Sequence, residues 1–216
     1  MEPRLLAVAH GTAAADGSAT TARLVDAIRA ARRAVTVDLC FLDVVAPRLS
    51  DALDERPTVV VPLLLSTGYH VQTDIPAAVT GRPAARVARH LGPDELLVDV
   101  LLDRLPAGSG GSVALVGAGS TRSEAAAELA EMGRLLGSRL ASRVQVLTLG
   151  EDVRAGLEKL APPVRVATYL LAEGQFVISL RAAAEGIGPV AGPLGVHPAL
   201  VQLAWQRYDE AINRTG

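Results

Sequence analysis

The stretch VVVPLLLSTGYHV (residues 59–71) predicts a buried strand that ends at polar side chains. Apolar residues run from Val59 to Leu65, and the chain then passes through a Ser-Thr-Gly-Tyr segment to His70. Runs that are apolar at every position are typical of parallel strands covered on both faces. LLAVAHGT (residues 5–12) has the same form and ends at His10. The sequence therefore predicts two buried strands that each deliver a histidine to the edge of a sheet.

The surrounding chain alternates between short apolar runs and segments with helical spacing. The Val- and Leu-rich runs predict strands at 4–9, 35–42, 58–65 and, more weakly, 84–89. Between and after them, residues 21–34 and 94–105 have the spacing of amphipathic helices. Strands that alternate with helices predict an α/β fold with a doubly wound parallel sheet.

The same pattern returns after the flexible segment PAGSGGS (residues 106–112). Three later segments correspond to three earlier ones in the same order: VALVGAGS (113–120) to LLAVAHGT, TYLLAEGQFV (168–177) to PLLLSTGYHV, and PLGVHPALVQLAWQRYDEA (193–211) to HLGPDELLVDVLLDRL. Ordered self-similarity indicates duplication. We predict two similar doubly wound halves, 1–108 with the metal-site histidines and 112–216 as a degenerate repeat.

The two strand-end histidines are the first candidates for a functional site. Ligands of open parallel sheets bind beyond the carboxyl ends of the strands, where His10 and His70 are both expected. In the second half, Ala118 and Phe176 stand at the corresponding positions. A histidine needed by the fold should occur in both halves, so the asymmetry favours a functional pair. Loop histidines bonded to nearby backbone remain the alternative.

The residue types of this site suit a divalent transition metal. Imidazole binds iron, cobalt, nickel and zinc, and Asp43 at the end of the second strand could add a carboxylate. A solvated loop acid is the alternative for Asp43. His90 follows a predicted strand and could line the same edge, although a structural role is favoured. His197 precedes Pro198 at the start of the last helix and is interpreted as a loop residue.

Two other motifs point to different chemistry and are weaker. The AHGT segment is similar to the Arg-His-Gly motif of histidine phosphatases, but Ala9 replaces the phosphate-binding arginine. A hydrolase of that type is therefore disfavoured. GAGSTRSE (residues 117–124) has the glycines of a phosphate loop without its lysine, which indicates a tight strand-to-helix turn. The single cysteine, Cys40, lies in an apolar run and is interpreted as a buried structural thiol.

Composition excludes several classes of protein. Half of the 216 residues are hydrophobic, only 3% are aromatic, and the net charge is −2, which argues against a nucleic-acid binder. The apolar runs are too short to span a membrane, and the first residues lack the features of a signal peptide. We therefore expect a cytoplasmic protein that binds neither nucleic acid nor membranes.

Four segments resemble the sirohydrochlorin chelatase family: AVAHGT, FLDVVAPRLSDAL, PLLLSTGYHVQTDIP and LGPDELLVDVLLDRL. The resemblance extends over essentially the whole chain. It implies two similar α/β halves with the active-site cleft between them, and metal-handling histidines at His10 and His70. Asp43 stands where a glutamate is expected in the family, so its shorter side chain places a metal contact in question.

The family implies insertion of Fe²⁺ or Co²⁺ into sirohydrochlorin, an acidic tetrapyrrole, for siroheme or cobalamin synthesis. Ni²⁺ is a further candidate metal, and no ATP or other cofactor is expected. We expect a monomer whose two halves form a pseudo-dimer. The alternative function is a tetrapyrrole or metal carrier, which would hold its ligand without turnover. The predicted substrate-binding residues are Gly11, Ser66, Thr67, Gly68 and Tyr69, with Arg82, Arg86 and Arg89 as partners for the carboxylates.

Overall fold

The computed structural model describes residues 2–12, 14–108 and 110–214, and the chain falls into two compact units. The first unit comprises Met1–Leu91 and Val196–Gly216, and the second comprises Gly92–Gly195. Ser109, within the predicted linker, lies outside the described residues. Each unit is an α/β structure around its own parallel sheet, as the alternating pattern predicted.

The first unit contains a four-stranded parallel sheet in the order β2-β1-β3-β4. Its strands are β1 (Arg4–Ala9), β2 (Val37–Phe41), β3 (Thr58–Pro62) and β4 (Ala85–Val87). Every residue of β1 and β3 is buried, because these central strands are covered on both faces. Val8 in β1 lies opposite Pro62 in β3, so the two strands end side by side.

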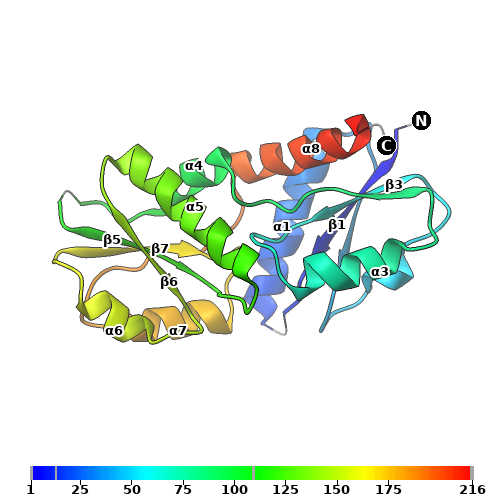
Figure 1. Cartoon of the computed structure of the whole chain (residues 1–216). Helices are drawn as coiled ribbons and strands as arrows, with labels where there is room; N and C mark the ends of the chain where they lie inside the picture. Colours follow the sequence, from blue (N-terminus) through cyan, green and yellow to red (C-terminus); the bar gives the residue numbers. More distant parts are fainter. Residues whose placement is uncertain (1, 13, 109, 215–216) are drawn as a thin grey trace. The chain divides into compact units, whose positions relative to one another are not determined.

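Helices cover both faces of this sheet. They are α1 (Ala15–Ala31), α2 (Leu49–Ala52), α3 (Ile75–Val79), the π-helical turn η1 (His70–Asp74), and α8 (Pro198–Asn213). Leu6, Val8 and Val60 pack with Leu49 of α2 and Ile75 of α3 in one buried cluster. On the other face, α1 packs against β2 and α8 packs against β3 and β4 (Figure 1).

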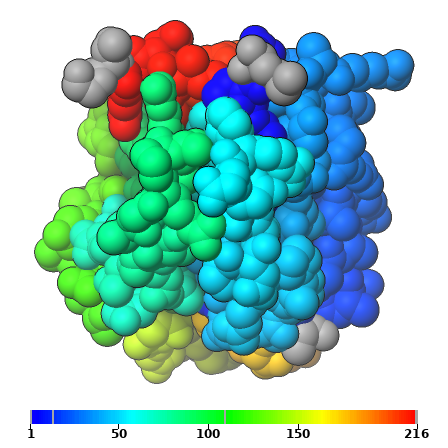
Figure 2. Space-filling model, turned by 90° about the vertical axis from the view of Figure 1, so that its right-hand side faces the viewer, coloured from blue at the N-terminus to red at the C-terminus, as the bar shows by residue number. Residues whose placement is uncertain are grey.

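The last helix, α8, is firmly attached to the first unit. The indole Nε1 of Trp205 donates a hydrogen bond to the carbonyl oxygen of Ile28 in α1, at 3.1 Å. The Arg32 guanidinium lies 4.5 Å from the centre of the Trp205 ring and forms an ion pair with Asp209. The Tyr208 hydroxyl donates to a carbonyl near the start of the chain, and Figure 2 shows that start, in dark blue, beside the red helix.

The second unit contains a three-stranded parallel sheet in the order β6-β5-β7. Its strands are β5 (Ser112–Gly117), β6 (Val144–Thr148) and β7 (Val164–Tyr169). An isolated parallel bridge between Val166 and Val190 stands where the first sheet has its fourth strand. The helices are α4 (Glu95–Arg104), α5 (Ser123–Leu140), α6 (Val153–Glu158) and α7 (Gln175–Ala183).

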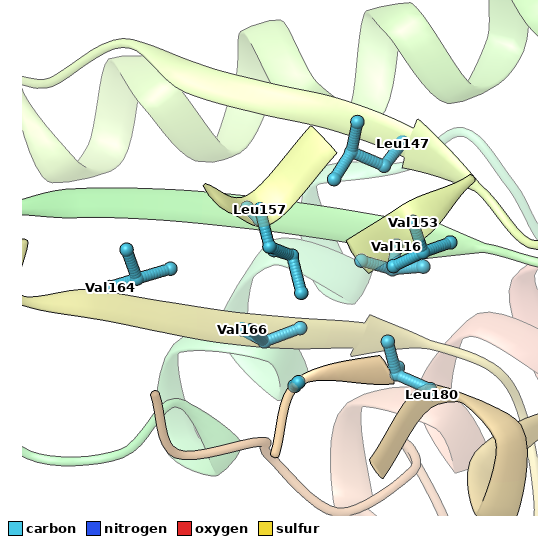
Figure 3. Close-up of a cluster of buried hydrophobic side chains, with 9 residues drawn as sticks. Val116, Leu147, Val153, Leu157, Val164, Val166 and Leu180 are labelled. Atoms are coloured by element: carbon cyan, nitrogen blue, oxygen red, sulfur yellow. The ribbon is translucent and has the colours of Figure 1, made fainter. Parts of the chain in front are cut away.

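A buried aliphatic cluster holds α6 and α7 to one face of the second sheet. Figure 3 shows Leu157 of α6 and Leu180 of α7 directed toward Val116 and Val166 of the strands. Helices α4 and α5 contact each other, and they contact β7 and β6 respectively. This cluster consists of Ala, Val and Leu side chains and contains no aromatic ring, in agreement with the aromatic content of 3%.

Equivalent hydrogen bonds recur in the two units. The Leu42 amide donates to Ala9 after β2, and the Leu149 amide donates to Gly117 after β6. The Leu91 and Leu194 amides likewise donate to the carbonyl oxygens of Leu64 and Leu170, respectively, at 2.8 and 2.9 Å. These pairs occupy the corresponding positions of the sequence repeat, which supports an internal duplication.

The compact units differ from the predicted halves 1–108 and 112–216 by one helix each. Helix α4 follows β4 in the chain but belongs to the second unit, whereas α8 ends the chain and belongs to the first. Both helices bury an apolar stripe, through Leu97 and Leu101 in α4 and through Leu200 and Leu203 in α8. The stripe predicts that a helix is buried without indicating which sheet it covers.

Candidate active site

His10 is placed by the end of β1. The chain turns at Gly11, whose φ of +96° lies in the region that favours glycine. A Cβ atom at Gly11 would lie 2.1 Å from the carbonyl oxygen of Asp43, so a side chain cannot be accommodated there. The Asp43 amide also donates to the His10 carbonyl oxygen at 3.0 Å. Gly11 thus has a backbone role that leaves the His10 side chain exposed at the sheet edge.

His70 is placed by the loop after β3 and begins the π-helical turn η1. Single π-helical turns are rare and occur frequently at functional sites. The turn brings Asp74 back toward His70, and Nδ1 of the imidazole lies 2.5 Å from Oδ2 of the carboxylate. The His70 side chain is 26% exposed, so one part of the ring is covered while another remains accessible.

The structure brings the two predicted histidines together. The ring centroids of His10 and His70 lie 4.6 Å apart, with the planes at 88° to each other. The neighbouring ends of β1 and β3 explain this proximity, because each strand delivers its histidine to the same edge. Sixty residues of sequence separate two side chains that form one edge-to-face pair.

Hydrogen bonding defines which ring nitrogens can act on a ligand. Nδ1 of His10 lies 3.1 Å from the Gly11 carbonyl oxygen, which can only accept a hydrogen bond. The carboxylate of Asp74 likewise requires a donor at Nδ1 of His70. Each neutral imidazole therefore carries its hydrogen on Nδ1 and its lone pair on Nε2. Two Nε2 atoms with lone pairs can bind a metal ion or accept protons.

Asp74 contacts His70, although the sequence analysis assigned no role to Asp74. A carboxylate bonded to the second nitrogen of a histidine fixes the ring and raises its basicity as a ligand. The spacing of four residues from His70 was the available signal, since such pairs share one face of a helix.

Asp43 lies at the predicted edge, but its carboxylate has other contacts. Oδ1 accepts a hydrogen bond from the Val44 amide at 2.8 Å and lies 3.5 Å from the Arg48 guanidinium. Among residues 2–12, 14–108 and 110–214, the structure contains no cluster of three His, Cys, Asp or Glu side chains that could hold a metal. The predicted metal contacts of His10, His70 and Asp43 stay predictions, and the structure adds Asp74 as the partner of His70.

The loop between β3 and His70 contains the other predicted substrate-binding residues. Ser66 and Gly68 are partly exposed, whereas the side chain of Thr67 is turned inward and is only 8% exposed. Tyr69 is 59% exposed, and its ring centroid lies 6.3 Å from that of His70. Tyr69 therefore offers an aromatic surface beside the histidine pair, and Thr67 does not face solvent.

The three predicted arginines lie at different places on the first unit. Arg82 precedes β4 and donates to the Leu53 carbonyl oxygen at 2.8 Å, near the amino-terminal edge of the sheet. Arg86 lies within β4 and donates to Ile212 of α8 at 3.0 Å. Arg89 follows β4, at the edge where the histidines lie, and is exposed. Only Arg89 is at the edge predicted for substrate binding.

The structure also places the remaining candidates of the first unit. His197 is the N-cap of α8, and its Nδ1 accepts a hydrogen bond from the Ala199 amide at 3.1 Å. His90 is 5% exposed and contacts Thr67. Cys40 is fully buried, as predicted for a structural thiol, and desolvation raises its pKa to about 12.

The corresponding edge of the second unit lacks these groups. Ala118 is exposed at the end of β5, and Phe176 is 56% exposed near the start of α7. The GAGSTRSE segment forms the predicted tight turn, with Gly119 at φ +83° and α5 beginning at Ser123. A hollow lined by Arg181, Glu185 and neighbouring residues lies at the far end of α7 and contains neither of the paired histidines.

Three solved structures share the fold of this chain. SirB from Bacillus subtilis with Fe³⁺ is 20% identical, with a TM-score of 0.81 and coverage of 99% of this chain and 96% of that one. SirB from B. subtilis subspecies spizizenii in complex with cobalt is 22% identical, with a TM-score of 0.78 and coverages of 99% and 97%. CbiX, described as the terminal enzyme for biosynthesis of siroheme in denitrifying bacteria, is 22% identical, with a TM-score of 0.74 and coverages of 96% and 99%.

Sequence comparison adds a match that covers the site. No curated protein matches the chain at a significant level. The CbiX family model matches residues 4–107, the segment that contains His10, His70 and Asp74. The chain is therefore similar to the CbiX family over residues 4–107, and it shares its fold with SirB and CbiX along nearly its whole length.

Proposed function

We propose that the protein inserts Fe²⁺ or Co²⁺ into sirohydrochlorin without ATP, for siroheme or cobalamin synthesis. The observation that carries this proposal is the edge-to-face pair of His10 and His70, with both Nδ1 atoms held by oxygen acceptors. The solved structures support the substrate and the metals, because SirB of subspecies spizizenii is described as a sirohydrochlorin chelatase in complex with cobalt, and SirB from B. subtilis is described with Fe³⁺.

The reaction exchanges one divalent metal ion for two pyrrole protons of the macrocycle. The metal must lose water before it enters the ring, and the two protons need acceptors. Nε2 of His10 and Nε2 of His70 serve both needs, since imidazole binds these metals and accepts protons near neutral pH. The Asp74 carboxylate accepts a hydrogen bond from Nδ1 of His70 and so holds the ring with Nε2 as the atom that acts on the metal or proton.

The edge around the histidines suits an acidic macrocycle with apolar faces. Tyr69 offers its exposed ring to a face of the macrocycle, and Arg89 at the same edge suits a carboxylate. Gly11, Ser66 and Gly68 add small residues and backbone groups near the two rings, so a flat ligand can approach closely. We propose that Thr67 supports this surface from behind, because its side chain is buried.

The proposal includes a monomer that acts in the cytoplasm, with the metal as a substrate in place of a resident cofactor. The two similar units within one chain support the monomer, since they supply a pseudo-dimer without a second copy. Among the described helices, each is too short or too polar to cross a membrane. Light scattering of the purified protein would measure the mass, and a dimer would contradict this part of the proposal.

The deciding experiment is an anaerobic absorbance time course. Purified protein is mixed with an excess of sirohydrochlorin, and Fe²⁺ or Co²⁺ is added without ATP. We expect the spectrum of the metallated product to develop over many turnovers for each protein molecule. A change that stops at one equivalent would indicate a carrier that holds its ligand. An unchanged rate relative to the protein-free reaction would overturn the proposed function.

A further inference from the structure

A buried contact between two side chains lies directly before the loop that carries His70. Oγ1 of Thr67 lies 3.1 Å from Nε2 of His90. Thr67 is 8% exposed and His90 is 5% exposed, so water does not compete freely for this hydrogen bond. Thr67 lies in the connection after β3, and His90 lies in the connection after β4, 23 residues later in the chain.

The backbone around His90 is held from two directions. Leu91, its neighbour, donates its amide to the Leu64 carbonyl oxygen at 2.8 Å, which extends the pairing beyond the strands. From α8, Arg207 donates Nε to the carbonyl oxygen of His90 at 3.0 Å and Nη2 to that of Leu91 at 2.9 Å. Arg207 is 1% exposed, so α8 fixes His90 through a fully buried guanidinium.

The second unit has an equivalent of the arginine contact, but its described residues contain no equivalent of the hydrogen bond between Thr67 and His90. Arg104 of α4 donates Nη2 to the Leu194 carbonyl oxygen at 3.3 Å, which is the equivalent of Arg207 with Leu91. At the positions of Thr67 and His90, however, the repeat has Glu173 and Pro193. The arginine contact is therefore part of the fold, since both units have it. The Thr–His contact belongs only to the unit with the histidine pair.

We propose that His90 is a positioning residue for metal insertion and acts through Thr67 on the placement of His70. The inference rests on the proposed function, because that function assigns metal insertion to His70. Thr67 begins the turn that runs into η1, where the Gln72 amide donates to the Gly68 carbonyl oxygen at 3.1 Å. Only Gly68 and Tyr69 lie between Thr67 and His70, so a displaced Thr67 carries the imidazole away from His10.

The test uses substitutions that change the hydrogen bond with little change in volume. Thr67→Val removes the hydroxyl group, and Thr67→Ser retains it. His90→Gln keeps a polar atom near the position of Nε2, whereas His90→Leu does not. The matched control is Thr168→Val in the second unit, which removes another buried hydroxyl hydrogen bond, from Thr168 to the Ala191 carbonyl oxygen at 2.7 Å.

Steady-state insertion kinetics, Co²⁺ binding to the protein alone, and melting temperature are measured for each variant. We expect Thr67→Val and His90→Leu each to lower kcat/KM for the metal about 10-fold and to weaken Co²⁺ binding similarly, as for outer partners of metal ligands. KM for sirohydrochlorin should stay near the wild-type value. Thr67→Ser and His90→Gln should restore most of the loss, and Thr168→Val should lower only the melting temperature.

Two different failures can be separated. If the wild-type protein inserts metal and Thr67→Val loses melting temperature but keeps its kcat/KM and Co²⁺ affinity, as Thr168→Val does, the contact is structural and the positioning role is overturned. If the wild-type protein inserts no metal, the proposed function itself fails, and the positioning role fails with it. His90→Leu is the more disruptive variant, so Thr67→Val decides the question if His90→Leu does not fold.

Discussion

Asp74 holds His70 through a contact of 2.5 Å between Oδ2 and Nδ1, and the two residues lie four apart in one helical turn. This carboxylate orients the imidazole and leaves Nε2 for the metal. The proposed function of His70 depends on Asp74, because this carboxylate is the partner that holds the ring. The relationship makes Asp74 the first residue to test beyond the histidines.

Asp74→Asn should lower kcat/KM for metal insertion by about 10- to 100-fold. The amide oxygen can still accept the Nδ1 hydrogen bond, but a bond to a neutral amide holds the ring less firmly than one to a carboxylate. Steady-state absorbance kinetics at several metal concentrations would measure the effect. Asp43→Asn provides the contrast, because the Asp43 carboxylate lies against Arg48 and we expect only a small change. Equal losses in both variants would contradict this assignment.

His10→Ala and His70→Ala should each reduce turnover by at least about 10- to 100-fold at saturating metal. The double variant should be little worse than the more damaging single variant, because residues that act as a unit are not additive. Far-ultraviolet circular dichroism should show an unchanged fold, since both side chains lie outside the strands.

The control for the histidine pair places imidazoles in the second unit, by Ala118→His together with Phe176→His. Both positions are exposed, so the substitutions should be tolerated, and activity should remain near the wild-type level or fall. Near-normal insertion by His10→Ala and His70→Ala would show that the metal reaches the macrocycle by another route.

Arg89→Gln should raise KM for sirohydrochlorin and reduce its dependence on salt, with little effect on kcat. A guanidinium that attracts a carboxylate from solvent is screened by ions, so its removal flattens the salt response. Arg82→Gln is the matched control: its guanidinium donates to the Leu53 carbonyl oxygen at the other edge, and its loss should affect stability only. A KM that responds to Arg82 and not to Arg89 would place the substrate carboxylates elsewhere.

The Cys40 thiol should resist modification until the protein unfolds, because burial raises its pKa to about 12. A thiol reagent at pH 8 should react with one group in denaturant and with none under native conditions. The unfolded thiol ionises near pH 9, while the folded one keeps its proton, so stability should fall as pH rises from about 9 toward 12. Cys40→Val should lack this part of the decline in urea denaturation. Rapid native-state modification would show that the site is open to solvent.

The strands and the histidine pair could be predicted because their signals are local. The uninterrupted apolar run at 4–9 coincides with β1, and a histidine after a parallel strand must lie at its carboxyl edge. The run at 58–65 extends beyond β3, which ends at Pro62, although Leu63 and Leu64 still make single backbone hydrogen bonds to Val8 and Leu91. Helix α1 begins before the predicted residue 21 because its first turn is made of small and polar residues without an apolar stripe.

What could not be predicted depends on contacts between distant segments. Arg82 and Arg89 are close in sequence but lie at opposite ends of β4, so proximity to the histidine loop did not place them at one edge. The hydrogen bond between Thr67 and His90 could not be predicted, because it forms only when the connections after β3 and β4 lie side by side. The exchange of α4 and α8 between the units follows from packing. An apolar stripe on a helix does not indicate which sheet the helix will cover.

That exchange has a consequence for how the protein is made. A ribosome releases residues in chain order, so all four strands of the first unit, with both histidines, emerge before the helix that completes the unit. The second unit is one uninterrupted segment and needs nothing that is synthesised after it. The guanidinium that fixes His90 arrives within the last ten residues of the described chain. Chains in which α8 has not yet been synthesised would therefore contain both histidines without the buried arginine that supports His90, and the site can be assembled only after α8 has emerged.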